Sequence, residues 1–88
     1  MDTFKTPQPS ESLSSYVSRI RKKLNLTQFQ LADAAGIHGR SIWKIERGLT
    51  VKINRRTLQG LAIALGVPQE YLDALIKGEE PAFLTSSA

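Results

Sequence analysis

The chain has 88 residues, enough for one small domain, and a modest formal net charge of +4. It has no cysteine and one histidine, which excludes disulfides, thiolate metal sites and clusters of histidine ligands, so we expect neither metal nor cofactor. No apolar run approaches the roughly 18 residues of a membrane span, and the N-terminus lacks the apolar core of a secretion signal, so we expect a cytoplasmic protein with no membrane partner.

Helical periodicity covers most of the chain and is missing at its two ends. Residues 1–10 contain two prolines and no periodicity, which predicts a flexible N-terminal arm. Residues 79–88 are predicted to form a C-terminal tail, because Pro81 stops a helix before it. The domain is therefore expected at 11–78. Its first helix is predicted from about residue 12 to 24, with an apolar stripe formed by Leu13, Tyr16, Val17, Ile20 and Leu24.

The second and third predicted helices flank a glycine turn. Thr27 is a good N-cap for a helix that runs to residue 35, and Gln30 can complete a capping box. Gly36 can adopt a positive φ, end this helix and reverse the chain before a third helix at 39–47. Two helices joined by such a short turn at about 90 to 120° form a helix-turn-helix unit. The residues expected to pack its inner angle are Leu31, Ala35, Ile37, Ile42 and Ile45.

Two more helices are predicted after a loop at residues 48–55. Thr57 is expected to cap a fourth helix at 58–65, which ends at Gly66, and Pro68 lies in the first turn of a fifth. The buried side of the fifth helix is expected to contain Tyr71, Leu72, Leu75 and Ile76. No stretch alternates apolar and polar residues as strands do, so the expected fold class is all-α with five helices.

Positive charge is concentrated in the middle of the chain. Residues 19–56 contain ten Lys or Arg residues against two acidic ones, whereas the rest of the chain has two Lys against six acidic residues. This asymmetry indicates one positive face that could bind a polyanion. A merely solvated surface is the alternative.

The segment TQFQLADAAGIHGRSIWKIERG, residues 27–48, resembles the helix-turn-helix of Cro and the lambda repressor, in the XRE family. The segments TLQGLAIALGV and YLDALIKG resemble the fourth and fifth helices of that family, so the likeness covers about residues 12–78. It implies a five-helix lambda-repressor-like domain with the helix-turn-helix at helices two and three. It also implies a sequence-specific transcriptional regulator, and a repressor is favoured over an activator. The expected location is the cytoplasm and nucleoid of a bacterium or phage-infected cell.

The resemblance implies which residues face base edges. In this motif the third helix lies in the major groove of double-stranded DNA and presents its N-terminal residues to the bases. Matched residue by residue, the base contacts fall on His38, Arg40, Ser41 and Lys44. Arg40 and Lys44 are the main candidates because both can donate to guanine O6 and N7, and contact with phosphate alone is the alternative. Gly39 departs from the pattern, since it has no side chain to contact a base.

Contacts to the DNA backbone are expected from both ends of the helix-turn-helix unit. Free N–H groups at the start of the second helix form an anion site, and basic residues follow the third helix. The residues expected at the backbone are Thr27, Gln28, Trp43, Arg47, Lys52, Asn54, Arg55 and Arg56. Contact with a thymine methyl group, contact with a partner protein and packing into the core are the alternatives for Trp43.

Glu46 is an acid at the DNA-facing end of a basic helix, where it would repel phosphate. The resemblance implies that Glu46 forms a structural ion pair with Arg21 of the first helix. Removing one partner of such a pair would cost about 3–5 kcal/mol if the pair is buried.

The partners expected are double-stranded DNA and a second copy of the chain, with the fifth helix and the tail as the dimer interface. The alternative function is an antitoxin or coactivator-like protein-interaction module, with a toxin or RNA polymerase as its partner. We expect no enzyme, because the chain has no nucleophile elbow, phosphate loop or paired catalytic carboxylates.

Overall fold

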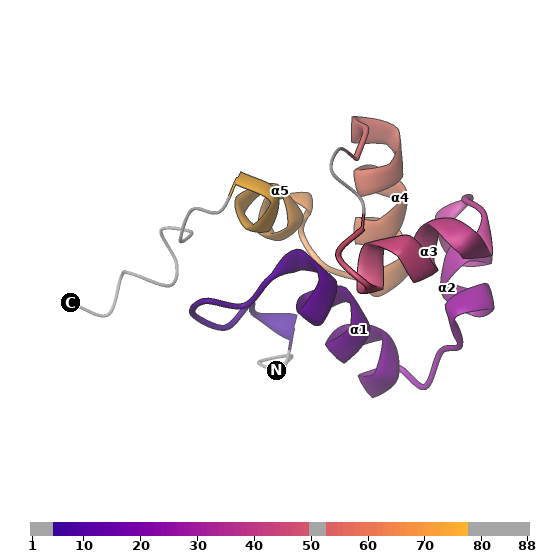
Figure 1. Cartoon of the computed structure of the whole chain (residues 1–88), viewed down its shortest axis with the longest axis horizontal. Helices are drawn as coiled ribbons and strands as arrows, with labels where there is room; N and C mark the ends of the chain where they lie inside the picture. The colour runs from indigo at the N-terminus through magenta and orange to yellow at the C-terminus, as the bar shows by residue number, and fades with distance from the viewer. Residues whose placement is uncertain (1–4, 50–52, 78–88) are drawn as a thin grey trace.

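The computed structural model describes residues 5–49 and 53–77, and these form five α-helices. The helices are α1 (Leu13–Lys23), α2 (Gln28–Ala35), α3 (Gly39–Glu46), α4 (Arg55–Leu65) and α5 (Gln69–Lys77). Within these two ranges there is no strand, which confirms the predicted all-α class. Figure 1 shows α2 and α3 packed together at the end of the molecule away from α5. None of the described helices is long and apolar enough to cross a membrane.

Local sequence signals set the turn between α1 and α2 and the end of α2. Asn25 follows the end of α1 with a φ of 59°, a left-handed conformation that Asn tolerates better than most residues. The predicted capping box is present: the N–H of Gln30 donates to Thr27 Oγ1 at 3.0 Å, and the N–H of Thr27 donates to Gln30 Oε1 at 2.9 Å. Gly36 ends α2 with a φ of 73°, which a residue with a Cβ rarely adopts. The chain therefore reverses where predicted and begins α3 three residues later.

The fourth helix begins earlier than the sequence analysis predicts. Its N-cap is Asn54, whose Oδ1 accepts a hydrogen bond from the backbone N–H of Thr57 at 2.7 Å. The prediction of Thr57 as the cap was therefore wrong, and the loop predicted to end at residue 55 gives way to helix at that residue. Asn is at least as good an N-cap as Thr, so the earlier candidate takes the position. As a result Arg55 and Arg56 belong to the first turn of α4.

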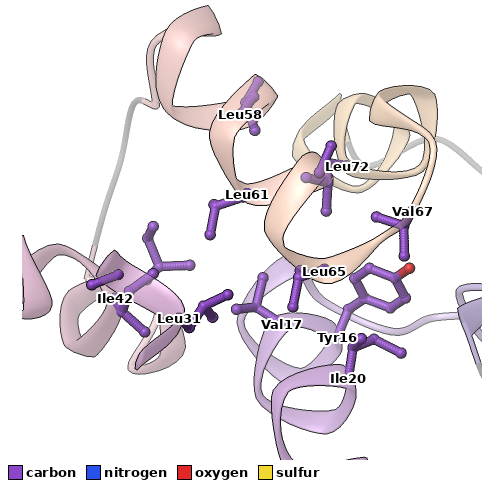
Figure 2. Close-up of a cluster of buried hydrophobic side chains, with 13 residues drawn as sticks. Tyr16, Val17, Ile20, Leu31, Ile42, Leu58, Leu61, Leu65, Val67 and Leu72 are labelled. Atoms are coloured by element: carbon purple, nitrogen blue, oxygen red, sulfur yellow. The ribbon is translucent and has the colours of Figure 1, made fainter. Parts of the chain in front are cut away.

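Side chains from all five helices meet in one core, shown in Figure 2. The buried residues are Tyr16, Val17, Ile20, Leu31, Ala32, Ile42, Ile45, Leu58, Leu61, Ala62, Leu65, Val67 and Leu72. Ile42 and Ile45 anchor α3 on this core, so the opposite side of α3 faces solvent. In α5, Leu72 is buried and Tyr71 and Leu75 pack partly against the core, but Ile76 is 42% exposed, contrary to its predicted burial.

Helices α2 and α4 approach each other closely at Gly60, in the middle of α4. A Cβ built on Gly60 would lie 2.3 Å from the carbonyl oxygen of Ala35 at the end of α2, which is closer than any real contact. The absence of a side chain at Gly60 therefore allows α2 of the helix-turn-helix unit to pack closely against α4.

The segment before α1 packs along the domain. Pro7 is buried, the hydroxyl of Tyr16 donates to the carbonyl oxygen of Lys5, and Arg19 donates to the carbonyl oxygen of Thr6 at 3.1 Å. Arg19 also forms an ion pair with Glu11, with Nε and Oε2 2.8 Å apart. From Lys5 onward the predicted N-terminal arm therefore contacts the domain, which the sequence analysis did not anticipate.

Candidate nucleic-acid interface

The solvent-facing side of α3 carries the residues predicted to contact bases. The side chains of His38, Arg40 and Lys44 are exposed, and Ser41 is partly covered. His38 occupies the N-cap position of α3 with extended backbone, but it makes no side-chain capping hydrogen bond within the described structure. Three of the four side chains are thus accessible to solvent, and the imidazole takes no part in capping the helix. Among the described residues, no group of three or more side chains could hold a metal ion.

Arg21 and Glu46 form a bidentate ion pair between α1 and α3, the pair that the family resemblance implies. Arg21 Nε and Nη2 donate to Oε2 and Oε1 of Glu46 at 2.5 and 3.0 Å, and the two side chains are 13% and 7% exposed. Arg21 Nη1 also donates to the carbonyl oxygen of Leu26 at 2.8 Å, and Gln28 Nε2 donates to Glu46 Oε1 at 3.2 Å. The negative charge of Glu46 is therefore compensated inside the protein rather than presented to phosphate.

The protonation of Glu46 follows from this network. Burial alone raises the pKa of the carboxyl group, but the hydrogen bonds from Arg21 and Gln28 and the positive charge of Arg21 outweigh it. The pKa of Glu46 is therefore held below its ordinary value of 4.5. The carboxylate stays ionised at neutral pH, and the ion pair remains intact under the conditions in which a DNA-binding protein would work.

Three residues predicted at the DNA backbone use their side chains within the protein. Thr27 and Asn54 cap α2 and α4, and Gln28 donates to Glu46. Any contact that these residues make with phosphate while the caps stay formed would therefore come from the backbone N–H groups at the two helix N-termini. Such N–H groups have no partner within a helix and bind anions well.

The remaining backbone candidates that the structure describes lie in the second half of α3 and in the first turn of α4. Arg55 and Arg56 are exposed in the first turn of α4, which holds no acidic residue. Arg47 is the C-cap of α3, and its guanidinium lies 4.9 Å from the centre of the Trp43 ring, a cation–π contact. Lys52 lies outside the described residues.

An aromatic hollow of about 600 Å³ opens beside the start of α3. Its lining residues are Gln28, Phe29, His38, Gly39, Arg40 and Trp43. Trp43 is 40% exposed, so it faces outward, and Phe29 of α2 is 80% exposed. The sequence analysis missed Phe29. The signal that could have found it is its position on α2, away from the helix side that carries Leu31 and Ala35.

The comparisons with known proteins agree with this geometry. The model of a helix-turn-helix family, HTH_3, matches residues 17–79, which include most of α1 and the whole of α2 to α5. A search of curated proteins found no match. Domains of the matched family bind DNA and are typically not enzymes. Because the match spans most of the chain and coincides with the capped α2, the Gly36 turn and the solvent-facing α3, the chain belongs to the Cro/C1-type (XRE) helix-turn-helix family of DNA-binding domains.

Proposed function

We propose that the protein is a sequence-specific transcriptional regulator that inserts the solvent-facing side of α3 into the major groove of double-stranded DNA. The observation that carries the proposal is the division of α3 into two sides. Ile42 and Ile45 are buried, whereas Arg40 and Lys44 are exposed on the same helix. The one acidic residue of α3, Glu46, is neutralised by Arg21. The helix therefore presents a cationic side without a competing negative charge.

The proposed contacts divide into two kinds. Arg40 and Lys44 donate to base edges, with His38 and Ser41 beside them, because they lie in the first two turns of α3, where base contacts are made in this motif. Arg47, Arg55, Arg56 and Lys52 bind phosphates. Phosphate contacts fix the register of the protein on the duplex and supply affinity that does not depend on sequence.

We further propose that the protein binds as a homodimer and represses transcription by covering a promoter. The exposed Ile76 supports this, because an apolar side chain on α5 outside the core is suited to a contact between copies. A second candidate function, a protein-interaction module of the antitoxin or coactivator kind, is favoured by the exposed rings of Phe29 and Trp43. A protein partner on that surface would compete with DNA for the same side of α3.

Selection of bound fragments from a random duplex pool tests the proposed function. We expect an enriched sequence made of two related half-sites about 34 Å apart, one helical turn, as a dimer of this motif requires. Trp43 is the sole tryptophan of the chain, so its emission should change when the selected duplex is added. If about six phosphates are contacted, log affinity should fall with log salt concentration with a slope near −5. Equal binding of selected and random duplexes would refute sequence-specific regulation.

Two arginine substitutions separate the two kinds of contact. Arg40→Ala should relax the preference at one base pair, with a loss of discrimination of about 1–3 kcal/mol there. Arg55→Ala should weaken binding to all sequences alike and reduce the salt slope by about one. Both side chains are exposed, so neither change should alter the fold. Fluorescence titrations of each variant against the selected duplex and its single-base variants measure both effects. A uniform loss in Arg40→Ala would assign Arg40 to phosphate instead.

A further inference from the structure

We infer that Phe29 and Trp43 form an apolar contact surface for the 5-methyl group of a thymine, next to the base contacted by Arg40. This inference rests on the proposed function and adds a specificity determinant from α2, which lies outside the recognition helix. A thymine presents its methyl group in the major groove, and apolar side chains distinguish it there from cytosine. The hollow beside the start of α3 is the place where this contact would occur.

The relation between Phe29 and Gly39 is the first argument. A Cβ built on Gly39 would lie 3.6 Å from Cδ1 and Cε1 of Phe29, so the ring of Phe29 lies directly beside the first residue of α3. Gly39 stands where the motif would offer a side chain to a base, and it has none. The ring of Phe29 occupies the space beside this position. The apolar surface that α3 lacks at its N-terminus is therefore supplied by the neighbouring helix.

The exposure of the two rings is the second argument. Phe29 is 80% exposed and Trp43 is 40% exposed, and both line the same hollow. An exposed phenylalanine contributes little to stability, since the free energy gained by an apolar side chain scales with the area it removes from water. Phe29 therefore adds little to the stability of the folded monomer, but its burial by a bound partner would contribute favourable free energy to binding.

The charges around the hollow favour DNA as the partner that covers it. Arg40 lines the hollow, and the guanidinium of Arg47 lies against the ring of Trp43. Glu46, at the end of the same helix, is compensated by Arg21. An apolar surface that has cations beside it matches the major groove, where apolar methyl groups lie between two rows of phosphates. A protein partner would need an acidic rim to fit the same place.

The test removes single methyl groups from the DNA. Each thymine of the selected duplex is replaced in turn by uracil, which differs only in lacking the 5-methyl group. For the full-length protein we expect one position per half-site at which affinity falls about fourfold, the value for burying one methylene-sized group. In Phe29→Ala this thymine-to-uracil ratio should fall to about one. Placing 5-methylcytosine at that position in a cytosine variant should restore part of the lost affinity of the wild type but not of Phe29→Ala.

Ile63→Ala is the matched control. Ile63 is 71% exposed on α4 and does not line the hollow, so this variant should keep the wild-type ratio. Circular dichroism at the assay temperature establishes that both variants are folded. If the wild type selects a sequence but shows no uracil effect, or if Phe29→Ala keeps the ratio, the inference is wrong and the proposed function stands. If the wild type selects no sequence at all, the proposed function itself fails.

Discussion

Replacing Gly60 by alanine should lower the free energy of unfolding by about 2 kcal/mol, the upper end of the overpacking cost less the gain from alanine being the better helix former. Overpacking a filled contact typically costs 1–3 kcal/mol, and the intrinsic gain of alanine over glycine in a helix is only about 1 kcal/mol. The added Cβ would lie 2.3 Å from the carbonyl oxygen of Ala35. That atom belongs to the backbone and cannot rotate away, so α2 and α4 would have to separate. Thermal denaturation should show a fall in melting temperature of roughly 8 °C or more.

Gly39→Ala is the control for this prediction, because it makes the same chemical change at the start of another helix. Its Cβ would lie 3.6 Å from the ring of Phe29, an ordinary contact with a side chain that can move. We expect stability to stay within about 0.5 kcal/mol of the wild type or to rise slightly. Equal shifts in the two variants would show that the α2–α4 approach at Gly60 does not limit the packing.

Two glycines, Gly36 at the end of α2 and Gly60 within α4, show what a sequence can and cannot predict about this fold. The role of Gly36 follows from local physics, since a helix that must end and reverse needs a positive φ at that residue, and the structure has a φ of 73° there. The role of Gly60 depends on where α2 crosses α4, which no local pattern contains. The sequence offered one signal of this close contact, a glycine in the interior of a predicted helix.

The difference between local signals and packing between helices also explains the errors in the predictions for the fourth and fifth helices. Asn54 and Thr57 are both good N-caps three residues apart, and local chemistry ranks them too closely to choose. Ile76 has the spacing of a core residue, four positions after the buried Leu72, but it is 42% exposed, whereas its neighbour Leu75 packs partly against the core. The second error concerns which side chains of α5 the core covers, which is a property of the whole domain.

The residues of α3 in the candidate interface could be predicted from the sequence, but the residues that α2 places beside them could not. The side of α3 that faces solvent lies opposite Ile42 and Ile45, and the helical period predicts that these two residues are buried. The position of Phe29 beside Gly39 depends on how α2 and α3 meet. Likewise, the engagement of Gln28 with Glu46 depends on three helices together and could not be foreseen from α2 alone.

Replacing Glu46 by glutamine should lower the free energy of unfolding at pH 7 by about 3 kcal/mol, the lower part of the range for breaking a buried pair. Glutamine has nearly the same shape, so the loss reports the charge rather than the volume. Arg21 is 13% exposed and would keep only neutral acceptors, the new amide and the carbonyl of Leu26. Glu70→Gln, at an exposed residue of α5 that forms no ion pair within residues 5–49 and 53–77, makes the same change and should cost less than about 1 kcal/mol. Chemical denaturation of the three proteins measures the difference.

The pH dependence of this difference identifies its cause. The folded-state pKa of Glu46 lies below its ordinary value of 4.5, so its contribution to stability is present above that pH and is lost as pH falls towards the folded-state pKa. Protonated Glu46 resembles glutamine, so the gap between wild type and Glu46→Gln should close in acid. Glu11, whose pKa is also lowered by Arg19 against the effect of burial, keeps both proteins acid-sensitive. A gap that stays constant from pH 7 to acid would mean that the charge of Glu46 does not hold α1 to α3.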